Sequence, residues 1–215
     1  MNDEIIIEVN EVSKKYDDAT VLDNVSLEIE KGKIYGLVGR NGSGKTVLMK
    51  CICGLIKPTS GEVKVAGKTV GKDVDIPEDI GVIIETPGFI QNYSGFKNLK
   101  LLASVRNKIS NEEIRKNMEI VGLEPKSRKH VGKYSLGMRQ KLGIAQAIME
   151  NPKILILDEP MNGLDNESVA VVRKILKEQA ENGATIILAS HNREDIDVLC
   201  DKVYTMDHGV IECER

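Results

Sequence analysis

Residues 39–46 read GRNGSGKT, and this stretch decides the fold. It matches the pattern G-x-x-x-x-G-K-[ST], follows a short apolar strand predicted at 33–38, and precedes a helix predicted at about 45–54. In such a loop, backbone N–H groups turn inward around phosphate oxygens, and the N-terminus of the helix adds partial positive charge. The stretch therefore predicts a P-loop that binds a nucleoside triphosphate.

This loop supplies most of the predicted nucleotide contacts. We expect Lys45 to reach the β- and γ-phosphates and the hydroxyl of Thr46 to ligate Mg²⁺. The residues predicted to bind nucleotide in this segment are Gly39, Arg40, Asn41, Gly42, Ser43, Gly44, Lys45, Thr46 and Val47. The loop alone does not distinguish a kinase, a GTPase and a motor ATPase.

A second segment, LILDEP at 155–160, supplies carboxylates. Its apolar part is continuous, as in a strand covered on both faces, and it carries Asp158 to the carboxyl end of the sheet, where ligands collect. We predict that Asp158 holds Mg²⁺ and that Glu159 orients or deprotonates the attacking water. A base beside the metal serves a water molecule, so the pair favours hydrolysis over transfer to an acceptor.

The order of the remaining segments indicates an α/β fold in one domain over 1–215. We expect further strands and helices at 4–9, 21–29, 62–66, 80–84, 154–157, 166–181, 184–189, 193–200 and 202–207. From about 153 onward strands and helices alternate, which is typical of a parallel sheet with crossover helices. The span of about 90–150 lacks strand signals, so it predicts a helical subdomain inserted into that sheet. Within it, Ser110 is expected to cap a helix.

The composition excludes several classes of protein. The 215 residues include 30 Lys and Arg against 33 Asp and Glu, and 41% are hydrophobic, which is typical of a globular protein. The longest apolar stretches are far shorter than a bilayer span, and the first ten residues do not resemble a signal peptide. With 2 Phe, 5 Tyr, no Trp and a net charge of -3, stacking surfaces and basic patches are scarce. We therefore expect no transmembrane span and no nucleic-acid partner.

The segment YSLGMRQ at 134–140 resembles the signature motif of the ATP-binding-cassette (ABC) ATPases. It is followed by LDEP at 157–160, by GLD at 163–165 and by SH at 190–191, in the order of that family. The resemblance covers essentially the whole chain. It implies a P-loop NTPase with an ABC-type ATPase core, in which a mixed β-sheet is flanked by helices, with an N-terminal antiparallel β subdomain and an inserted α-helical subdomain.

The resemblance also implies roles for single residues. Tyr16 matches the aromatic residue that stacks on adenine, and Asp165 matches the loop that crosses the dimer interface. Ser135 and Gly137 match the contacts to a γ-phosphate held by the opposite subunit, and Ser135 can cap the helix that follows it. His191 matches the histidine that fixes the γ-phosphate and the attacking water.

Together these roles imply an ATPase that uses ATP and Mg²⁺. The residues expected to act in catalysis are Glu159, His191 and Lys45, and those expected to hold the metal are Thr46, Asp158 and Glu85. The resemblance further implies a head-to-tail dimer, in which each ATP lies between the P-loop of one subunit and the Ser135 helix of the other.

Glu85 departs from the family pattern, which usually has glutamine at the end of this strand. Glutamine can ligate Mg²⁺ and touch a membrane partner without adding charge, whereas Glu85 adds a carboxylate near Asp158, Glu159 and a triphosphate. Either a bound Mg²⁺ ion offsets the repulsion among these negative charges, or the Glu85 side chain points away from the site until the membrane partner binds. The sequence leaves both explanations open.

Three segments narrow the resemblance: IETPGFIQNYSGFKNL at 84–99, YSLGMRQKLGIA at 134–145 and EPMNGLD at 159–165. They are similar to the subgroup that serves bacitracin-type export and lantibiotic self-immunity. This similarity implies an ATP-hydrolysing subunit at the cytoplasmic face of the membrane, paired with a second nucleotide-binding subunit and bound to separately encoded permease subunits. The exported molecule would be a peptide antibiotic or bacteriocin.

The aromatic residues Phe89, Tyr93 and Phe96 are candidates for a docking groove within 86–105 that receives a permease helix. The alternative is that they pack the helical subdomain.

Other functions remain as alternatives. One is a different ABC-2-type exporter, and a second is a soluble ABC ATPase that acts on DNA or the ribosome, which the charge of -3 disfavours. A P-loop kinase or GTPase leaves Ser135, Asp165 and His191 without an explanation.

Overall fold

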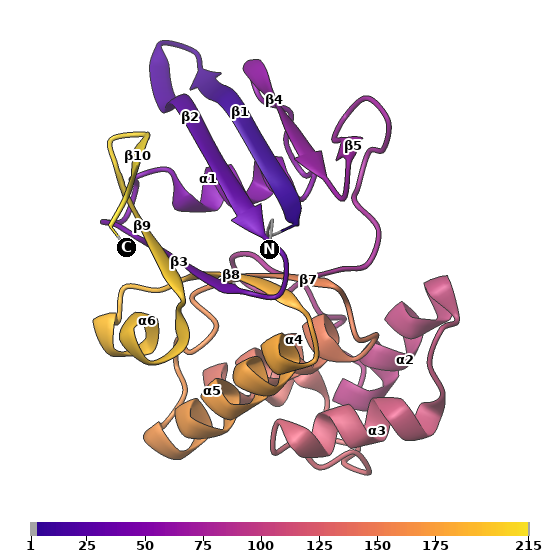
Figure 1. Cartoon of the computed structure of the whole chain (residues 1–215). Coiled ribbons are helices and arrows are strands. Elements are labelled where there is room, and N and C mark those ends of the chain that lie inside the picture. The colour runs from indigo at the N-terminus through magenta and orange to yellow at the C-terminus, as the bar shows by residue number, and fades with distance from the viewer. Residues whose placement is uncertain (1–3, 215) are drawn as a thin grey trace.

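Two β-sheets enclose one helix in the computed structural model, which describes residues 4–214 (Figure 1). The first sheet has four antiparallel strands in the order β2-β1-β4-β5. Its strands are β1 (Ile5–Tyr16), β2 (Ala19–Glu30), β4 (Ser60–Val65) and β5 (Lys68–Thr69). The expectation of an N-terminal antiparallel β subdomain is confirmed.

The second sheet is mixed and forms the centre of the molecule. Its strands are β3 (Ile34–Val38), β6 (Ile80–Ile83), β7 (Ile154–Asp158), β8 (Thr185–Ala189), β9 (Lys202–Asp207) and β10 (Val210–Cys213). They lie in the order β10-β9-β3-β8-β7-β6, and only β10 runs antiparallel to its neighbour. The predicted α/β fold with a mixed sheet is confirmed.

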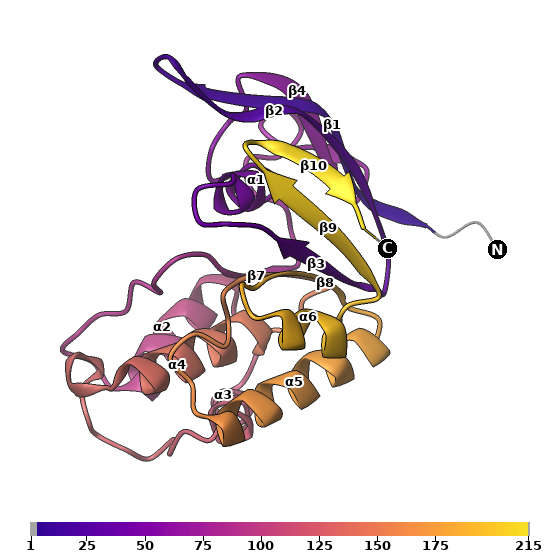
Figure 2. The same ribbon diagram turned by 90° about the vertical axis from the view of Figure 1, so that its left-hand side faces the viewer.

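Helix α1 (Lys45–Ile52) lies between the two sheets, as Figures 1 and 2 both show. Its side chains Leu48, Met49 and Ile52 are fully buried and share one apolar cluster with residues of both sheets, including Ile156 and Ile187 of the central sheet. This packing anchors the N-terminus of the helix, and with it the loop 39–44, against the central sheet.

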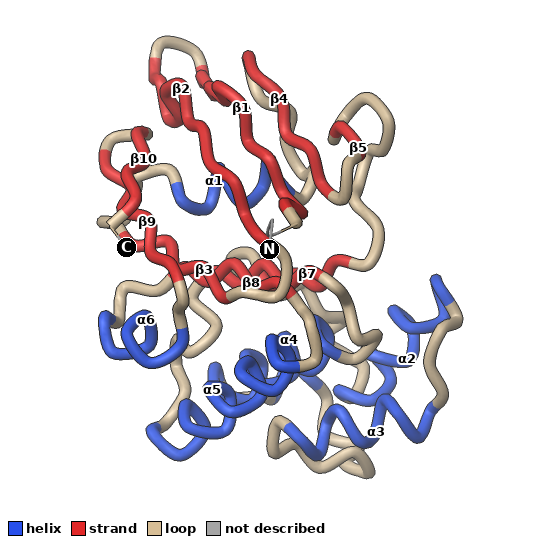
Figure 3. Tube along the Cα trace, in the orientation of Figure 1, coloured by secondary structure: helices blue, strands red, loops and turns tan. Residues whose placement is uncertain are grey.

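The opposite face of the central sheet is covered by helices, which Figure 3 shows below the strands. They are α2 (Gly95–Arg106), α3 (Asn111–Ile120), a 3₁₀ turn (Val131–Lys133), α4 (Leu136–Ile148), α5 (Asn166–Glu181) and α6 (Arg193–Leu199). Ser110 caps α3 in a complete capping box with Glu113, as predicted. Whether 90–150 acts as a separate subdomain stays a prediction. No helix within residues 4–214 is both long and apolar enough to cross a bilayer.

Two strands, β5 and β10, were not predicted from the sequence, and each omission has a local explanation. β5 has only two residues, too few to show a period. β10 is an edge strand with mostly exposed side chains, so it lacks an apolar signature. It pairs with β9 through a two-residue turn at His208 and Gly209, both with positive φ (45° and 81°), as a tight hairpin turn requires.

A buried ion pair fixes the segment that follows β8. The carboxylate of Asp195 on α6 is 1% exposed and accepts hydrogen bonds at 2.8 and 2.6 Å from Nε and Nη2 of Arg173 on α5. The Ser190 hydroxyl lies 3.4 Å from its other oxygen. This network ties the end of β8 to two helices, and thereby limits where residue 191 can lie.

We predict that Arg173→Met destabilises the fold, because it leaves the buried Asp195 carboxylate without its cation. Removing one partner of a buried pair costs about 3–5 kcal/mol in the free energy of unfolding. Urea denaturation should show this loss, whereas Lys174→Met, at a neighbouring exposed cation, should change stability by less than about 0.5 kcal/mol. Equal effects of the two substitutions would contradict a structural role for the pair.

Candidate active site

The loop 39–44 adopts a conformation that requires glycine at its first position. Gly39 has φ of 153°, and a Cβ at this position would lie 2.2 Å from the carbonyl oxygen of Met206. The Lys45 ammonium is buried and donates hydrogen bonds to the carbonyl oxygens of Gly39 and Arg40, at 2.7 and 3.0 Å. The loop is thus wrapped around its own lysine, which is already placed inside the curve of the backbone.

One polar atom in this loop is left without a partner. Within residues 4–214, the hydroxyl oxygen of Ser43 is the only buried side-chain nitrogen or oxygen that makes no hydrogen bond. An unpaired buried hydroxyl costs free energy unless a ligand satisfies it. The loop therefore fits an oxygen-rich anion, as a phosphate would supply.

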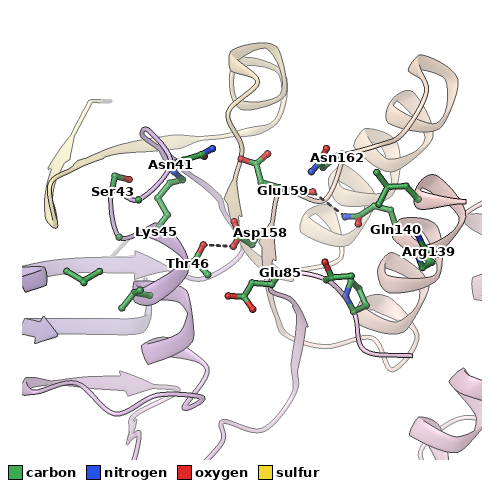
Figure 4. A pocket seen from close by; sticks show the side chains of 17 residues that line it. Asn41, Ser43, Lys45, Thr46, Glu85, Arg139, Gln140, Asp158, Glu159 and Asn162 are labelled. Carbon is green, nitrogen blue, oxygen red and sulfur yellow. Dashed lines mark hydrogen bonds between the residues drawn. The ribbon is translucent and has the colours of Figure 1, made fainter. Parts of the chain in front are cut away.

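Two of the three predicted metal ligands, Thr46 and Asp158, meet at the edge of the central sheet. The Thr46 hydroxyl donates a 2.7 Å hydrogen bond to Oδ2 of Asp158 at the end of β7 (Figure 4). A hydroxyl and a carboxylate are oxygen ligands of the kind that Mg²⁺ prefers. The donor set fits this ion, with the remaining positions open to water and phosphate.

Glu159 and His191 lie next to one another beyond that pair. Oε2 of Glu159 is 2.7 Å from Nδ1 of His191. Glu159 has φ of 50°, a strained conformation for a residue with a side chain, and such strain is common at functional sites. The carboxylate can accept a proton from a bound water, and the imidazole can orient the carboxylate.

Lys45, Thr46, Asp158 and Glu159 border an open cavity of about 460 Å³. Its lining residues are Val21, Asn41, Gly42, Ser43, Gly44, Lys45, Thr46, Val47, Glu85, Thr86, Pro87, Leu136, Arg139, Gln140, Asp158, Glu159 and Asn162. Arg139, Gln140 and Asn162 also line the cavity, although the sequence did not predict them as site residues. All three lie inside the motifs YSLGMRQ and EPMNGLD, so motif membership was the signal that could have identified them.

Seven predicted site residues do not line this cavity: Tyr16, Gly39, Arg40, Ser135, Gly137, Asp165 and His191. Tyr16 is 46% exposed at the end of β1, where the ammonium of Lys14 lies 4.9 Å from its ring centre. Ser135 is exposed, and its hydroxyl caps α4 by accepting from the N–H of Met138. Asp165 caps α5, and the N–H of Ser168 lowers the pKa of its carboxyl below the usual value.

Arg40 lies outside the cavity as well. Its guanidinium pairs with the carboxylate of Asp207 on β9 at 3.1 Å and lowers the pKa of that carboxyl. The contact ties the P-loop to the strand beside it. Gly39 does not form part of the cavity wall. Its carbonyl oxygen instead accepts a hydrogen bond from the Lys45 ammonium.

The unusual Glu85 has a counter-ion that the sequence did not suggest. Its carboxylate lies 2.5 Å from the ammonium of Lys50 in the last turn of α1. Glu85 lines the same cavity as Asp158 and Glu159, yet residues 4–214 contain no cluster of three or more His, Cys, Asp or Glu side chains that could hold a metal. The extra negative charge thus has a counter-ion, the Lys50 ammonium, within the same subunit.

Comparisons with known proteins agree with this geometry. Residues 22–162 match a family model described as "ABC transporter". The chain is 47% identical to the ABC transporter ATP-binding protein YybJ of Bacillus subtilis (strain 168), covering 96% of this chain and 95% of that protein. It is 43% identical to the bacitracin transport ATP-binding protein BcrA of Enterococcus faecalis, covering 96% of this chain and 68% of that one.

A third relative and a solved structure extend the pattern. The lantibiotic transport ATP-binding protein SrtF of Streptococcus pyogenes is 36% identical, with 98% of this chain and 90% of that protein covered. A structure described as the ATP-binding subunit of an ABC transporter superposes with a TM-score of 0.86 at 27% identity, over 97% of this chain and 90% of that one. Sequence and fold therefore point to the same group of proteins.

The pairing of Glu85 with Lys50 predicts a compensating pair of substitutions. Lys50→Met leaves the Glu85 carboxylate uncompensated near the bound triphosphate, so the dissociation constant for ATP should rise by up to about fivefold, as expected for a partly exposed pair. Calorimetric titration with ATP and Mg²⁺ would measure it.

The matched control is the double variant Lys50→Met/Glu85→Gln, which removes both charges and should restore ATP affinity. If the double variant binds ATP as weakly as Lys50→Met alone, the charge of Glu85 is not what Lys50 balances.

Proposed function

Because this chain belongs to the ABC transporter family and is an ATP-hydrolysing subunit, we propose that it powers the export of a peptide antibiotic or bacteriocin by separately encoded membrane subunits. The support for the cargo is the similarity to proteins named for bacitracin transport and lantibiotic transport. Such export would protect the cell from the peptide at the cytoplasmic membrane, with this chain on the cytoplasmic face.

The observation that carries the hydrolytic part is the contact between Glu159 and His191 beside the P-loop cavity. In our proposal, Lys45 exchanges the carbonyl oxygens of Gly39 and Arg40 for the β- and γ-phosphates of ATP. Glu159 takes the proton of the attacking water, and His191 holds the carboxylate and the γ-phosphate in place.

Thr46 and Asp158 are the residues that would hold Mg²⁺, which would neutralise charge on the transferred phosphoryl group. Their present hydrogen bond already holds the two oxygens together. Glu85 would join them only after it leaves Lys50.

Ser135, Gly137 and Asp165 support a dimer as the active form. Ser135 and Asp165 are exposed, and none of the three lines the cavity of its own subunit. Ser135 opens α4, whose N-terminus carries partial positive charge suited to a γ-phosphate. We place these residues against the ATP of a second subunit, and Tyr16 against the adenine of its own.

The surface proposed for the permease differs from the aromatic groove that the sequence suggested. Phe89 is buried in the core, and Phe96 is partly buried beneath the guanidinium of Arg115. Helix α2 instead exposes Leu101, Leu102 and Val105, the last at 82%. These three side chains recur at helical spacing, and they form an apolar face suited to a cytoplasmic helix of the permease.

We predict that Glu159→Gln retains ATP binding and nearly abolishes hydrolysis, because the amide is not a proton acceptor for water. A phosphate-release assay and gel filtration with ATP should show a stalled ATP-bound dimer. Lys45→Ala is the matched variant that should lose nucleotide affinity instead. Hydrolysis at the wild-type rate by Glu159→Gln would remove Glu159 from its proposed role.

The cargo is tested in cells. Deleting the gene for this chain should increase sensitivity to a bacitracin-type or lantibiotic peptide, and Glu159→Gln should fail to restore resistance. Membrane subunits should co-purify with the wild-type chain but less with Leu101→Asp/Val105→Asp. Unchanged sensitivity to every peptide in a panel, together with retained co-purification of a permease, would favour another ABC-2-type exporter.

A further inference from the structure

Gln140 links two parts of the molecule that the proposed reaction must coordinate. It lies on α4, five residues after the capping Ser135, and is 8% exposed. Its side-chain nitrogen donates hydrogen bonds to the carbonyl oxygens of Glu159 at 3.2 Å and Pro160 at 3.0 Å. Figure 4 shows this side chain reaching from α4 toward Glu159. Both protons of the amide are thus used on the backbone that carries the proposed base.

The backbone at Glu159 needs such support. Its φ of 50° lies in the left-handed region, which costs free energy for a residue with a Cβ and persists only when neighbouring contacts hold it. On one side, the N–H of Glu159 donates to the carbonyl oxygen of Ala189 at 2.9 Å. On the other side, Gln140 holds the two peptide oxygens that follow. The direction of the carboxylate is therefore set from β8 and from α4 together.

Helix α4 and the loop 159–163 also approach too closely to move independently. A Cβ on Gly137 would lie 2.9 Å from the carbonyl oxygen of Gly163. Between this contact and the Gln140 amide, the first two turns of α4 and the loop form one packed unit. The N-terminal part of α4 is thus in direct contact with the loop that carries Glu159.

We propose that Gln140 is a positioning residue for hydrolysis, which aims the Glu159 carboxylate and couples it to the Ser135 end of α4. The inference rests on the proposed role of Glu159 as the base. Gln140 itself does not touch the reacting atoms. Engagement of Ser135 by the ATP of a second subunit would tighten the same unit that orients the base in its own subunit.

Gln140→Met and Gln140→Glu test this role, since each keeps the approximate shape but removes the two donors. A misaimed base should lower kcat by about tenfold to a hundredfold. The KM and the dissociation constant for ATP should change by less than about twofold, because the P-loop is untouched. The melting temperature reports whether each variant is folded, and a folded variant of either kind suffices.

Gln146→Met is the matched control, because Gln146 is half-buried on the same helix, six residues beyond Gln140. It should hydrolyse ATP like the wild type. A kcat loss in Gln146→Met equal to that in Gln140→Met, or an ATP affinity that falls in step with kcat, would overturn the positioning role. So would wild-type kcat in a folded Gln140 variant.

A double-mutant cycle separates this inference from the proposed function. If Gln140 acts through Glu159, adding Gln140→Met to Glu159→Gln should not lower the residual rate further. If the double variant instead loses activity by the product of the two separate losses, Gln140 does not act through Glu159. If Glu159→Gln is inactive but Gln140→Met is not, only the positioning role fails, whereas wild-type activity of Glu159→Gln overturns both.

Discussion

The parallel pairing of β8 with β3 on one side and β7 on the other is the constraint on which the site depends. The register places Ala189 level with Leu37 and with Asp158. Because all three strands run in the same direction, the segments that follow them emerge at one edge of the sheet. The P-loop therefore meets the Glu159 loop and the His191 loop, although it lies more than a hundred residues before either of them in the sequence.

Charge balance is the second constraint, because the cavity gathers carboxylates where we propose that a triphosphate binds. Each of the three carboxylates in the cavity has a different contact. Asp158 accepts from Thr46, Glu159 lies against His191, and Glu85 pairs with Lys50. The first two leave their carboxylates facing the cavity, where a cation or a water proton can reach them. The third neutralises a charge that the family usually avoids by using glutamine at this position.

The sequence predicted what is decided locally. The P-loop glycines, the caps at Ser110 and Ser135, and the buried strand before Asp158 all carry their signals within a few residues. What it missed depends on contacts between distant segments: Lys50 with Glu85, and Gln140 with the carbonyl groups after β7. Motif spacing does not encode such partners, because the side-chain directions follow from packing.

Mixing two inactive variants tests whether ATP is hydrolysed at a composite site shared by two subunits. Lys45→Ala lacks the P-loop lysine, and Ser135→Arg blocks the surface proposed to face the partner's ATP. In a mixed dimer, one site combines the intact Lys45 of one chain with the intact Ser135 of the other. If the site is shared in this way, mixing restores ATP hydrolysis. A mixture no more active than the sum of its separate components, despite formation of mixed dimers, would contradict it.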